Sequence, residues 1–295
     1  MLDIFDRKIS IFEILCNEFK YAKEKYGVNI HWYIMTSEEN NDETENFFVS
    51  NNYFEYGREN ISFFKQGQLP MLDENGKVIL ESKYSIKLAG DGNGGIFKAM
   101  SKEVLDEMKE NGIEWVYVSG IDNILAEIID PLLIGLTISN NFMLSSKTVI
   151  KEEPNEKTGV YCKKNGKPAV IEYTEISEEL RNKRKSNGEL ELCEVNIVSN
   201  LFNIKLLEEV KRTTLPYHVA HKKCDYVDDN GDIKEALQPN AYKFEAFIFD
   251  VYNYIDDILL LRVKREDEFA PVKNKEGADS PETAKKMYEK KYAKI

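Results

Sequence analysis

The 295-residue sequence has few cysteines and no paired cysteine motif. Its four cysteines, at positions 16, 162, 193 and 224, lie far apart and form no Cys-x-x-Cys pair. This spacing argues against a cysteine-based zinc site or a disulfide framework. We therefore expect four free thiols and a reducing, cytoplasmic environment.

Long hydrophobic runs are also lacking. The longest apolar stretches, such as residues 248–261, are interrupted by Asp and Asn, and none reaches the roughly 20 apolar residues that span a membrane. The first ten residues contain no apolar core of the kind that marks a secretory signal. We therefore expect neither a membrane segment nor a secretory signal.

Positive charge is in deficit, because 40 Lys and Arg residues stand against 52 Asp and Glu residues, for a formal net charge of −12. Such a charge argues against non-specific binding to nucleic acid. It also repels anionic substrates, so that a phosphorylated substrate must be met by local cations or by a bound metal. The rest of the composition, 42% hydrophobic and 31% charged, is typical of a folded protein.

Apolar periodicity predicts that helices and strands alternate in the first half of the chain. Gly27 stands where the first helix needs a C-cap, and Asn75-Gly76 predicts a hairpin over residues 72–78. The expected helices cover residues 6–26, 42–50 and 96–109, and the expected strands cover residues 30–35, 61–64 and 114–118. This alternation indicates an α/β fold with a mostly parallel sheet.

The pattern changes after about residue 143, where short strands follow one another. Strands are expected at residues 143–151, 159–163 and 168–172, with Asn165-Gly166 as a tight turn between the last two. They predict an antiparallel insertion beside the parallel sheet. Further on, the sequence predicts a buried helix at residues 244–254, a strand at 258–263, and a charged surface segment that leads to a short C-terminal helix.

Two segments are suited to bind a phosphorylated ligand. Asp91-Gly92-Asn93-Gly94-Gly95 opens a predicted helix, and its glycines allow the backbone to approach a ligand closely, although a flexible turn explains it equally well. Asp122 follows a core strand at the end where open α/β sheets bind ligands. A lone carboxylate there suits Mg²⁺, which completes its coordination with phosphates and water; a helix cap is the simpler alternative.

Three other segments carry weaker signals. Gln66-Gly67 follows a strand and could read a nucleobase edge, because an amide both donates and accepts, or it could be a solvated turn. Glu172-Tyr173 is either a binding pair or an ordinary strand end. His218 and His221 could bind a metal or a phosphate, but they lack a third ligand nearby, which argues against zinc.

Taken together, these segments resemble motifs of UDP-N-acetylglucosamine pyrophosphorylases in their residues, order and spacing. The resemblance runs from Met1 to about Ala284, and several motifs in order are far more specific than any one of them. The matching segments are WYIMTS (32–37), QGQLP (66–70), DGNGG (91–95), VSGIDNIL (118–125), VIEYTEI (170–176), HVAHKK (218–223) and REDEFAPVKN (265–274).

The resemblance implies an α/β nucleotidyltransferase whose Rossmann-like core has a mixed, mostly parallel sheet. An antiparallel β insertion at about residues 143–200 would bind the sugar. Residues 1–275 would form this domain, and residues 276–295 would form a charged C-terminal tail with a helix. The reaction implied is the joining of UTP and a sugar 1-phosphate to give UDP-sugar and pyrophosphate, without a covalent enzyme intermediate.

The resemblance also assigns roles to individual residues. Asn93 favours N-acetylglucosamine 1-phosphate as the sugar substrate, because the UDP-glucose branch usually has His at this place. Mg²⁺ at Asp122 and the ammonium of Lys273, the two expected catalytic residues, would supply the positive charge that the composition lacks. The implied substrate contacts are Gln66 and Gly92 with uracil, Asn93, Gly159, Glu172 and Asn196 with the sugar, Phe247 and Phe249 around the sugar, and Lys273 with the phosphates.

One departure from the family bears on activity. Family members carry a Leu-x-Gly-Gly-x-Gly-Thr-Arg-Leu-Gly loop and a later Pro-Lys-Gly, and neither occurs in these 295 residues. That loop cradles the triphosphate, and its Arg and the later Lys stabilise the transition state. We therefore expect the chain to start inside the fold and to be inactive, or nearly so, by itself.

The same departure predicts an open edge on the strand that contains Trp32, available to solvent or to another chain. Three interpretations remain open. The chain is an enzyme completed by a separate N-terminal polypeptide that carries the Gly-rich loop, a non-catalytic UDP-sugar-binding protein, or a non-functional gene fragment. The preferred sugar and the oligomeric state also stay open.

Overall fold

The first helix shows how the local sequence sets the limits of an element. In the computed structural model, which describes residues 1–228 and 230–293, α1 spans Ile11–Tyr26. Ser10 caps it by accepting a hydrogen bond from Glu13 N, and Gly27 ends it at φ 69°, where glycine is favoured. The predicted helix at 6–26 is therefore right at its end and wrong at its start. Residues Arg7–Ile9 form strand β2, which pairs with β1 (Leu2–Ile4).

The next elements form a parallel β-α-β unit. β3 (Trp32–Thr36) pairs in parallel with β4 (Ile61–Lys65), and α2 (Asn41–Ser50) connects them. Two 3₁₀ turns, η1 (Asn52–Glu55) and η2 (Arg58–Asn60), complete the connection. Among the described strands, β3 has no partner on its second edge, which agrees with the open edge expected for the Trp32 strand.

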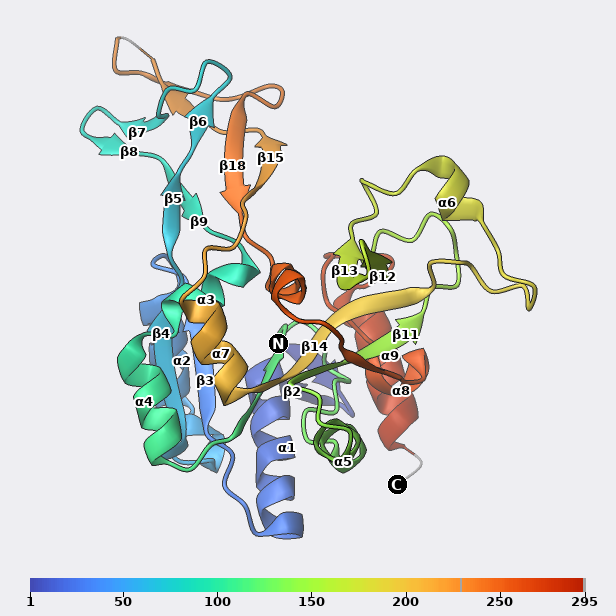
Figure 1. Cartoon of the computed structure of the whole chain (residues 1–295). Coiled ribbons are helices and arrows are strands. Elements are labelled where there is room, and N and C mark those ends of the chain that lie inside the picture. The colour runs from blue at the N-terminus through green and yellow to red at the C-terminus, as the bar shows by residue number, and fades with distance from the viewer. Residues whose placement is uncertain (229, 294–295) are drawn as a thin grey trace.

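A six-stranded mixed sheet forms the centre of the molecule, with the order β13-β12-β14-β11-β19 and with β10 paired to β14 (Figure 1). Its strands are β10 (Trp115–Ser119), β11 (Leu144–Ile150), β12 (Val160–Lys164), β13 (Lys167–Ile171), β14 (Glu194–Asn203) and β19 (Leu259–Arg262). The mixed α/β architecture is as predicted. Parallel pairs do not predominate: among the described strands, β3–β4 and β11–β19 are parallel and the other pairs are antiparallel. The main reason is β14, which the sequence did not predict and which runs antiparallel to β10, β11 and β12.

The predicted insertion is continuous with this sheet. β12 and β13 form the expected hairpin, and Asn165 and Gly166 turn the chain at φ 53° and 81°. β12 pairs with β14 through Val160 and Val195, so the hairpin extends the central sheet at its edge. A hydrophobic cluster of its own lies in this region and includes Val160 of β12 and Val195 of β14.

Short strands form a second projection above the body, seen with β6, β15 and β18 at the top of Figure 1. The hairpin predicted at residues 72–78 is present, with a bridge between Leu72 and Val78. The strands here are β5 (Gln68–Pro70), β6 (Leu72–Asp73), β7 (Leu80–Ser82), β8 (Ser85–Ile86), β9 (Leu88–Gly90), β15 (His218–Lys222), β16 (Tyr226–Val227), β17 (Ile233–Lys234) and β18 (Ala241–Glu245).

The segment after β18 differs from the single buried helix predicted at residues 244–254. β18 continues to Glu245, and a 3₁₀ helix, η4 (Ile248–Tyr254), follows the short connection Ala246-Phe247. The apolar residues that suggested one helix thus serve both a strand and a 3₁₀ turn. This change of direction brings the β18–η4 connection down from the upper projection into the body.

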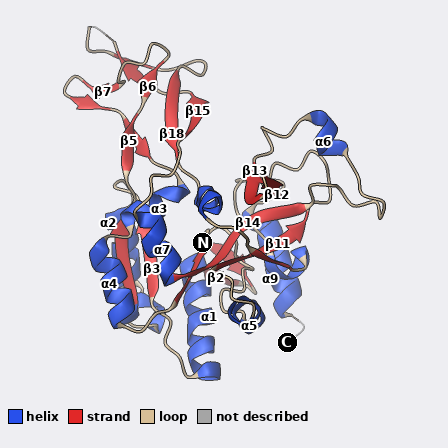
Figure 2. Cartoon of the chain, viewed as in Figure 1, coloured by secondary structure: helices blue, strands red, loops and turns tan. Residues whose placement is uncertain are grey.

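The remaining helices are η3 (Asn93–Gly95), α3 (Ile96–Ala99), α4 (Lys102–Glu110), α5 (Pro131–Ser139), α6 (Glu178–Asn182), α7 (Ile204–Lys211), α8 (Arg265–Glu268) and α9 (Pro281–Tyr292). Of these, α5 and α9 lie below the central sheet, whereas α6 lies at the outer end of the loops beyond β12 and β13 (Figure 2). The helix predicted at residues 96–109 is broken after Ala99, because Ser101 caps a new helix by accepting from Val104 N. In the described part of the chain, no helix is long and apolar enough to cross a membrane.

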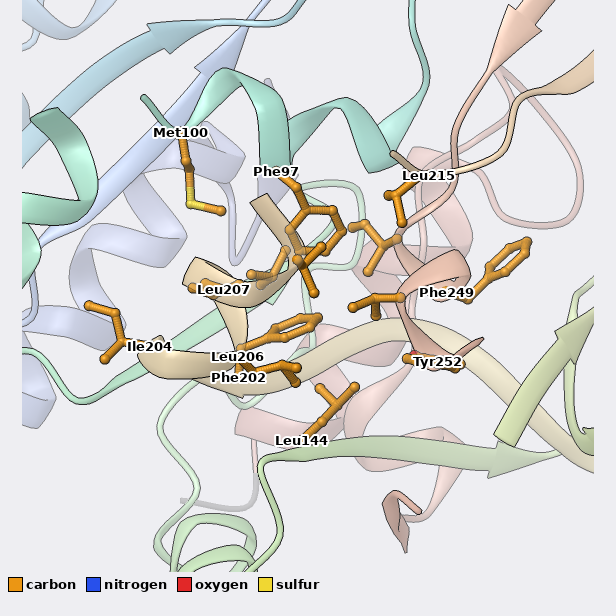
Figure 3. Close-up of a cluster of buried hydrophobic side chains, with 14 of the residues drawn as sticks. Phe97, Met100, Leu144, Phe202, Ile204, Leu206, Leu207, Leu215, Phe249 and Tyr252 are labelled. Atoms are coloured by element: carbon orange, nitrogen blue, oxygen red, sulfur yellow. The ribbon is translucent and has the colours of Figure 1, made fainter. Parts of the chain in front are cut away.

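The largest hydrophobic cluster joins both halves of the chain (Figure 3). Phe97 of α3, Phe202 of β14 and Tyr252 of η4 are buried in it, together with Leu144 and Leu207. This packing fixes η4 against the central sheet and the glycine-rich segment. A second cluster holds Ala284 of α9 against the β1–β2 hairpin, while the domain limits 1–275 and 276–295 stay a prediction. All four cysteines are free, as expected.

Candidate functional site

The glycine-rich segment is built around backbone contacts with the β18–η4 connection. Ala246 N donates to Asp91 O at 2.8 Å, and Gly94 N donates to Ala246 O at 2.9 Å. A Cβ atom at Gly94 would lie 2.7 Å from the carbonyl carbon and oxygen of Phe247, so a side chain does not fit there. Gly95 N donates to Gly92 O at 3.0 Å. At least two N–H groups of the segment are thus used inside the protein, and the glycines serve close packing.

Two residues assigned to uracil lie side by side. Gln66 Nε2 donates to Gly92 O at 2.7 Å, and Gln66 N donates to Thr36 O at the end of β3. None of the described residues donates to Gln66 Oε1. Gly92 has φ 87°, and a Cβ atom there would collide with the backbone of Ala246. The structure therefore brings Gln66 and Gly92 together at a place where an amide edge remains available.

Asp91 supports this arrangement from behind, a role that the sequence did not suggest. Its side chain is buried and lies so close to Gly67 and Gly95 that a Cβ atom at either glycine would meet the carboxylate. Burial raises the pKa of Asp91, and Gln66 acts in the opposite direction. In the described residues, Oδ1 has no hydrogen-bond partner. The Asp91 carboxylate thus packs against the backbone at Gly67 and at Gly95, and it leaves no room for a side chain at either position.

Three residues assigned to the sugar meet on the β12–β13–β14 side. Asn196 N donates to Gly159 O at 2.9 Å, and a Cβ atom at Gly159 would lie 2.9 Å from Glu172 Oε1. Tyr161 OH donates to Asn196 Oδ1 at 3.2 Å and orients the amide. Gly159, Glu172 and Asn196 therefore line one small region, although each comes from a different segment.

Glu172 is the half-buried carboxylate of this region. Burial raises its pKa, and the neighbouring Glu175 raises it further. His218 and Lys273, which come from other segments, act in the opposite direction and lower the pKa of Glu172. Lys273, the expected phosphate contact, is therefore within electrostatic reach of Glu172, a residue that the sequence assigns to the sugar.

The two phenylalanines assigned to the sugar lie at the start of η4. Their rings stack with centroids 4.9 Å apart, Phe247 half-buried and Phe249 buried. Asn93 Oδ1 accepts a hydrogen bond from Ile248 N at 2.9 Å, between the two phenylalanines. The Asn93 amide is exposed, so its nitrogen remains available to a ligand while its oxygen is held.

Asp122 and Lys273 lie on two adjacent segments. Val272 N donates to Asp122 O at 2.9 Å, and an antiparallel bridge joins Asn123 to Pro271. The Asp122 carboxylate is half-buried and makes no hydrogen bond or ion pair with the described residues. Lys273 is exposed, with Nζ 5.9 Å from the Phe269 ring centroid. The two expected catalytic residues therefore lie on neighbouring backbone segments, and neither side chain forms an ion pair within the described chain.

A buried lysine anchors the segment that carries Lys273. Lys147 on β11 is fully buried, and its Nζ lies 2.8 Å from Asp130 Oδ2 and 2.6 Å from Glu268 Oε2. It also donates to Glu127 O at 3.0 Å. A buried ammonium needs such partners, so this cluster fixes α8 and the following segment on the sheet.

The described residues contain no group of three or more His, Cys, Asp or Glu side chains arranged to hold a metal ion. His218 and His221 instead contact Asp250 and Glu74, at 2.9 and 3.4 Å. A single free carboxylate such as Asp122 still fits Mg²⁺, since that ion takes most of its ligands from phosphates and water.

Comparison with known proteins places the chain in a family. The sequence pattern of the family described as UTP--glucose-1-phosphate uridylyltransferase matches residues 1–279. The chain belongs to this family. The fold and the family expected from the sequence motifs are thus confirmed.

The relatives include acetylhexosamine enzymes by name. The chain is 40% identical to human UDP-N-acetylhexosamine pyrophosphorylase-like protein 1, over 90% of the chain and 54% of the relative. It is 39% identical to UDP-N-acetylglucosamine pyrophosphorylase of Saccharomyces cerevisiae, over 95% of the chain and 62% of the relative. The chain therefore spans only about half to three-fifths of the length of these curated relatives.

A solved structure shows the same fold. The uridine diphosphate N-acetylglucosamine pyrophosphorylase of Trypanosoma brucei, solved with an inhibitor, superposes with a TM-score of 0.84 at 31% identity. The match covers 97% of this chain and 60% of that one.

The structure adds residues to the site that the sequence did not single out for it. Asp250 Oδ2 accepts from Phe247 N at 2.8 Å, a local capping pattern that the spacing of the two residues could have suggested. Ala246 supplies the backbone groups that hold the glycine-rich segment, and Tyr161 orients Asn196. Neither contact has a local sequence signal, because the partners are far apart in the chain.

Proposed function

We propose that this chain forms the uridine-, sugar- and metal-binding part of a uridylyltransferase that joins UTP to a sugar 1-phosphate. The observation that carries the proposal is the β18–η4 connection. Ala246 holds the glycine-rich segment beside Gln66 through its backbone, and the next residue, Phe247, begins the aromatic pair of the sugar region. One connection thus touches both halves that a UDP-sugar would occupy.

N-acetylglucosamine 1-phosphate is the sugar substrate that we propose. The relatives at about 40% identity carry acetylhexosamine or N-acetylglucosamine in their names, and Asn93 stands in the Asp-Gly-Asn-Gly-Gly motif. The stacked phenylalanines offer an apolar surface for an acetyl methyl group, while Asn196 and Glu172 offer polar partners for the amide and hydroxyl groups.

In the proposed reaction, a phosphate oxygen of the sugar 1-phosphate attacks the α-phosphorus of UTP, and the bond from that phosphorus to the departing pyrophosphate breaks. Gln66, Gly92 and Asn196 would orient the two reactants, which is the main contribution a protein makes to such a transfer. Lys273 would lie against the phosphates. Mg²⁺ held by Asp122 would supply the remaining positive charge that offsets the phosphate oxygens.

We also propose that a Gly-rich triphosphate loop, which residues 1–295 do not contain, acts together with this site, on the same polypeptide or on a separate one. The second edge of β3 has no partner among the described strands and is a place where a further strand could pair. The four free thiols fit a reducing compartment, and we propose a cytoplasmic location.

The test is calorimetric titration of residues 1–295 with UDP, UDP-N-acetylglucosamine and UDP-glucose, beside a turnover assay with UTP, Mg²⁺ and N-acetylglucosamine 1-phosphate. We expect UDP-N-acetylglucosamine to bind more tightly than UDP or UDP-glucose. Turnover of these residues alone should be lower by several powers of ten than after addition of a polypeptide with the Gly-rich loop.

Two results would count against the proposal. Failure to bind any uridine nucleotide would refute the binding function. Tight binding without turnover, even with the Gly-rich loop supplied, would favour a non-catalytic UDP-sugar-binding protein.

A further inference from the structure

Two histidines on the same strand have similar partners but different surroundings. His218 and His221 are both on β15, and each contacts one carboxylate; His221 lies against one aromatic ring and His218 against two. His221 contacts Glu74 at 3.4 Å, and its ring lies 5.0 Å from Tyr242, all within the upper projection. His218 instead connects the projection with the sugar region.

The hydrogen bond of His218 is to a buried carboxylate. His218 Nε2 lies 2.9 Å from Asp250 Oδ1, and Asp250 is only 4% exposed. The other oxygen, Oδ2, accepts from Phe247 N at 2.8 Å. Asp250 therefore divides its two oxygens between β15 and the first turn of η4. Removal of the histidine would leave Oδ1 without its partner in a buried place, which is costly.

The His218 ring also packs against the aromatic pair. Its centroid lies 4.8 Å from the Phe247 centroid and 6.1 Å from the Phe249 centroid. Phe247 and Phe249 stack on each other at 4.9 Å, so the imidazole stands against one side of this pair. Phe247 is half-buried and Phe249 is buried, so the histidine packs most closely on the less buried ring of the pair.

The third observation connects His218 with Glu172. Among the charged groups that influence Glu172, His218 and Lys273 both lower the pKa of this carboxyl, against the larger effect of burial. His218 is thus near enough to Glu172 to act on it through space, although the two are on β15 and after β13.

We propose that His218 is a positioning residue of the sugar region. By holding Asp250 and packing on Phe247, it fixes the aromatic pair in the orientation that receives the sugar of a UDP-N-acetylhexosamine. This inference rests on the proposed function. It assigns no proton transfer to His218, and it predicts an effect on the sugar and none on the uridine.

The test compares dissociation constants for UDP and UDP-N-acetylglucosamine, measured by calorimetric titration on His218→Ala and on His221→Ala. The dissociation constant for UDP divided by that for UDP-N-acetylglucosamine measures the contribution of the sugar to binding. We expect His218→Ala to lower this ratio about tenfold, the loss of one hydrogen bond to a charged group, with UDP affinity unchanged. His221→Ala is the matched control and should leave both constants as they are.

A second pair of variants separates positioning from folding. His218→Gln still carries a donor for Asp250 and should recover part of the ratio, whereas His218→Phe keeps a ring, loses the donor and should not. If the alanine variant does not fold, His218→Phe is judged by the same ratio. The inference is overturned if UDP affinity falls together with that of UDP-N-acetylglucosamine, or if His221→Ala lowers the ratio equally. If the unmodified chain binds neither ligand, the proposed function fails and the inference fails with it.

Discussion

The two sides of the candidate site are built in different ways. On the proposed uracil side, backbone meets backbone: Ala246 pairs with Asp91 and Gly94, and no side chain fits at Gly92 or Gly94. On the proposed sugar side, side-chain contacts are added to one backbone bond, from Asn196 N to Gly159 O, and Phe247 stacks on a second ring. A surface made of backbone cannot be altered without moving the chain, whereas a surface made of side chains can be altered one group at a time. The uracil side should therefore be intolerant of substitution, and the sugar side should be where specificity changes.

The comparison can be measured with two ligands. A change on the uracil side should weaken the binding of UDP and of UDP-N-acetylglucosamine by the same factor, because both ligands carry the uridine. A change on the sugar side should weaken only UDP-N-acetylglucosamine. A sugar-side variant that bound both ligands more weakly by the same factor would show that the two sides are not separate.

The largest effect is expected for Gly92→Ala. A side chain at φ 87° is strained, and its Cβ atom would collide with Ala246, which together should cost about 3 kcal/mol or more of unfolding free energy. Both ligands should bind at least roughly a hundredfold more weakly. Chemical denaturation and calorimetric titration measure the two effects.

Gly76→Ala is the matched control for this change. Gly76 also has a left-handed backbone, at φ 78°, but no atom lies within 4 Å of an added Cβ. It should lose only about 1 kcal/mol of stability and keep its affinity for both ligands. Equal losses for the two glycines would show that backbone conformation matters and that close packing does not.

The next effect in size is expected for Phe247→Ala. This change removes one ring of the stacked pair and the surface on which His218 packs. UDP-N-acetylglucosamine should bind roughly thirtyfold more weakly, while UDP affinity stays within about twofold of the unmodified chain. Because UDP serves as the internal control, a parallel loss for both ligands would assign Phe247 to the uracil side or to the fold.

Gln66→Ala should have a smaller effect, about tenfold, on both ligands. The change removes the hydrogen bond of 2.7 Å to Gly92 O and the free Oε1. Gln68→Ala is its control, because Gln68 Nε2 donates to Glu39 at 2.8 Å on the surface and makes no side-chain hydrogen bond to Gly92 in the described residues. If Gln68→Ala had the same effect, Gln66 would have no special role.

The smallest effect is a pH-dependent change in stability for Glu172→Gln. Burial and Glu175 raise the pKa of Glu172 in the folded chain. A carboxyl with a raised pKa stabilises the fold below its ordinary pKa, about 4.3, and this contribution is lost as the pH rises through the raised value. Glu172→Gln should therefore melt a few degrees above the unmodified chain at pH 7, and the gap should close towards pH 4. A gap in melting temperature that does not change with pH would contradict it.

The local elements were predictable where short-range chemistry sets them. Ser10 and Gly27 mark the two ends of α1, and Asn165-Gly166 marks the turn of the β12–β13 hairpin. β14 was not predictable in the same way, because its polar residues do not look like those of a buried strand. Asn200 is 1% exposed, yet it is satisfied by Tyr252 OH, which donates at 2.9 Å from η4. A buried polar residue depends on a partner that no local pattern reveals.

The sequence by itself determined the family, the alternation of elements and the identity of most expected site residues. Their motifs are local, and the order of several motifs is specific. The tertiary structure decided which of these residues meet: Gln66 with Gly92, Gly159 with Glu172 and Asn196, and Asp122 beside the segment of Lys273. It also decided why the glycines are needed, which is the close approach of the β18–η4 connection. Such contacts join segments far apart in the chain, and only folding brings them together.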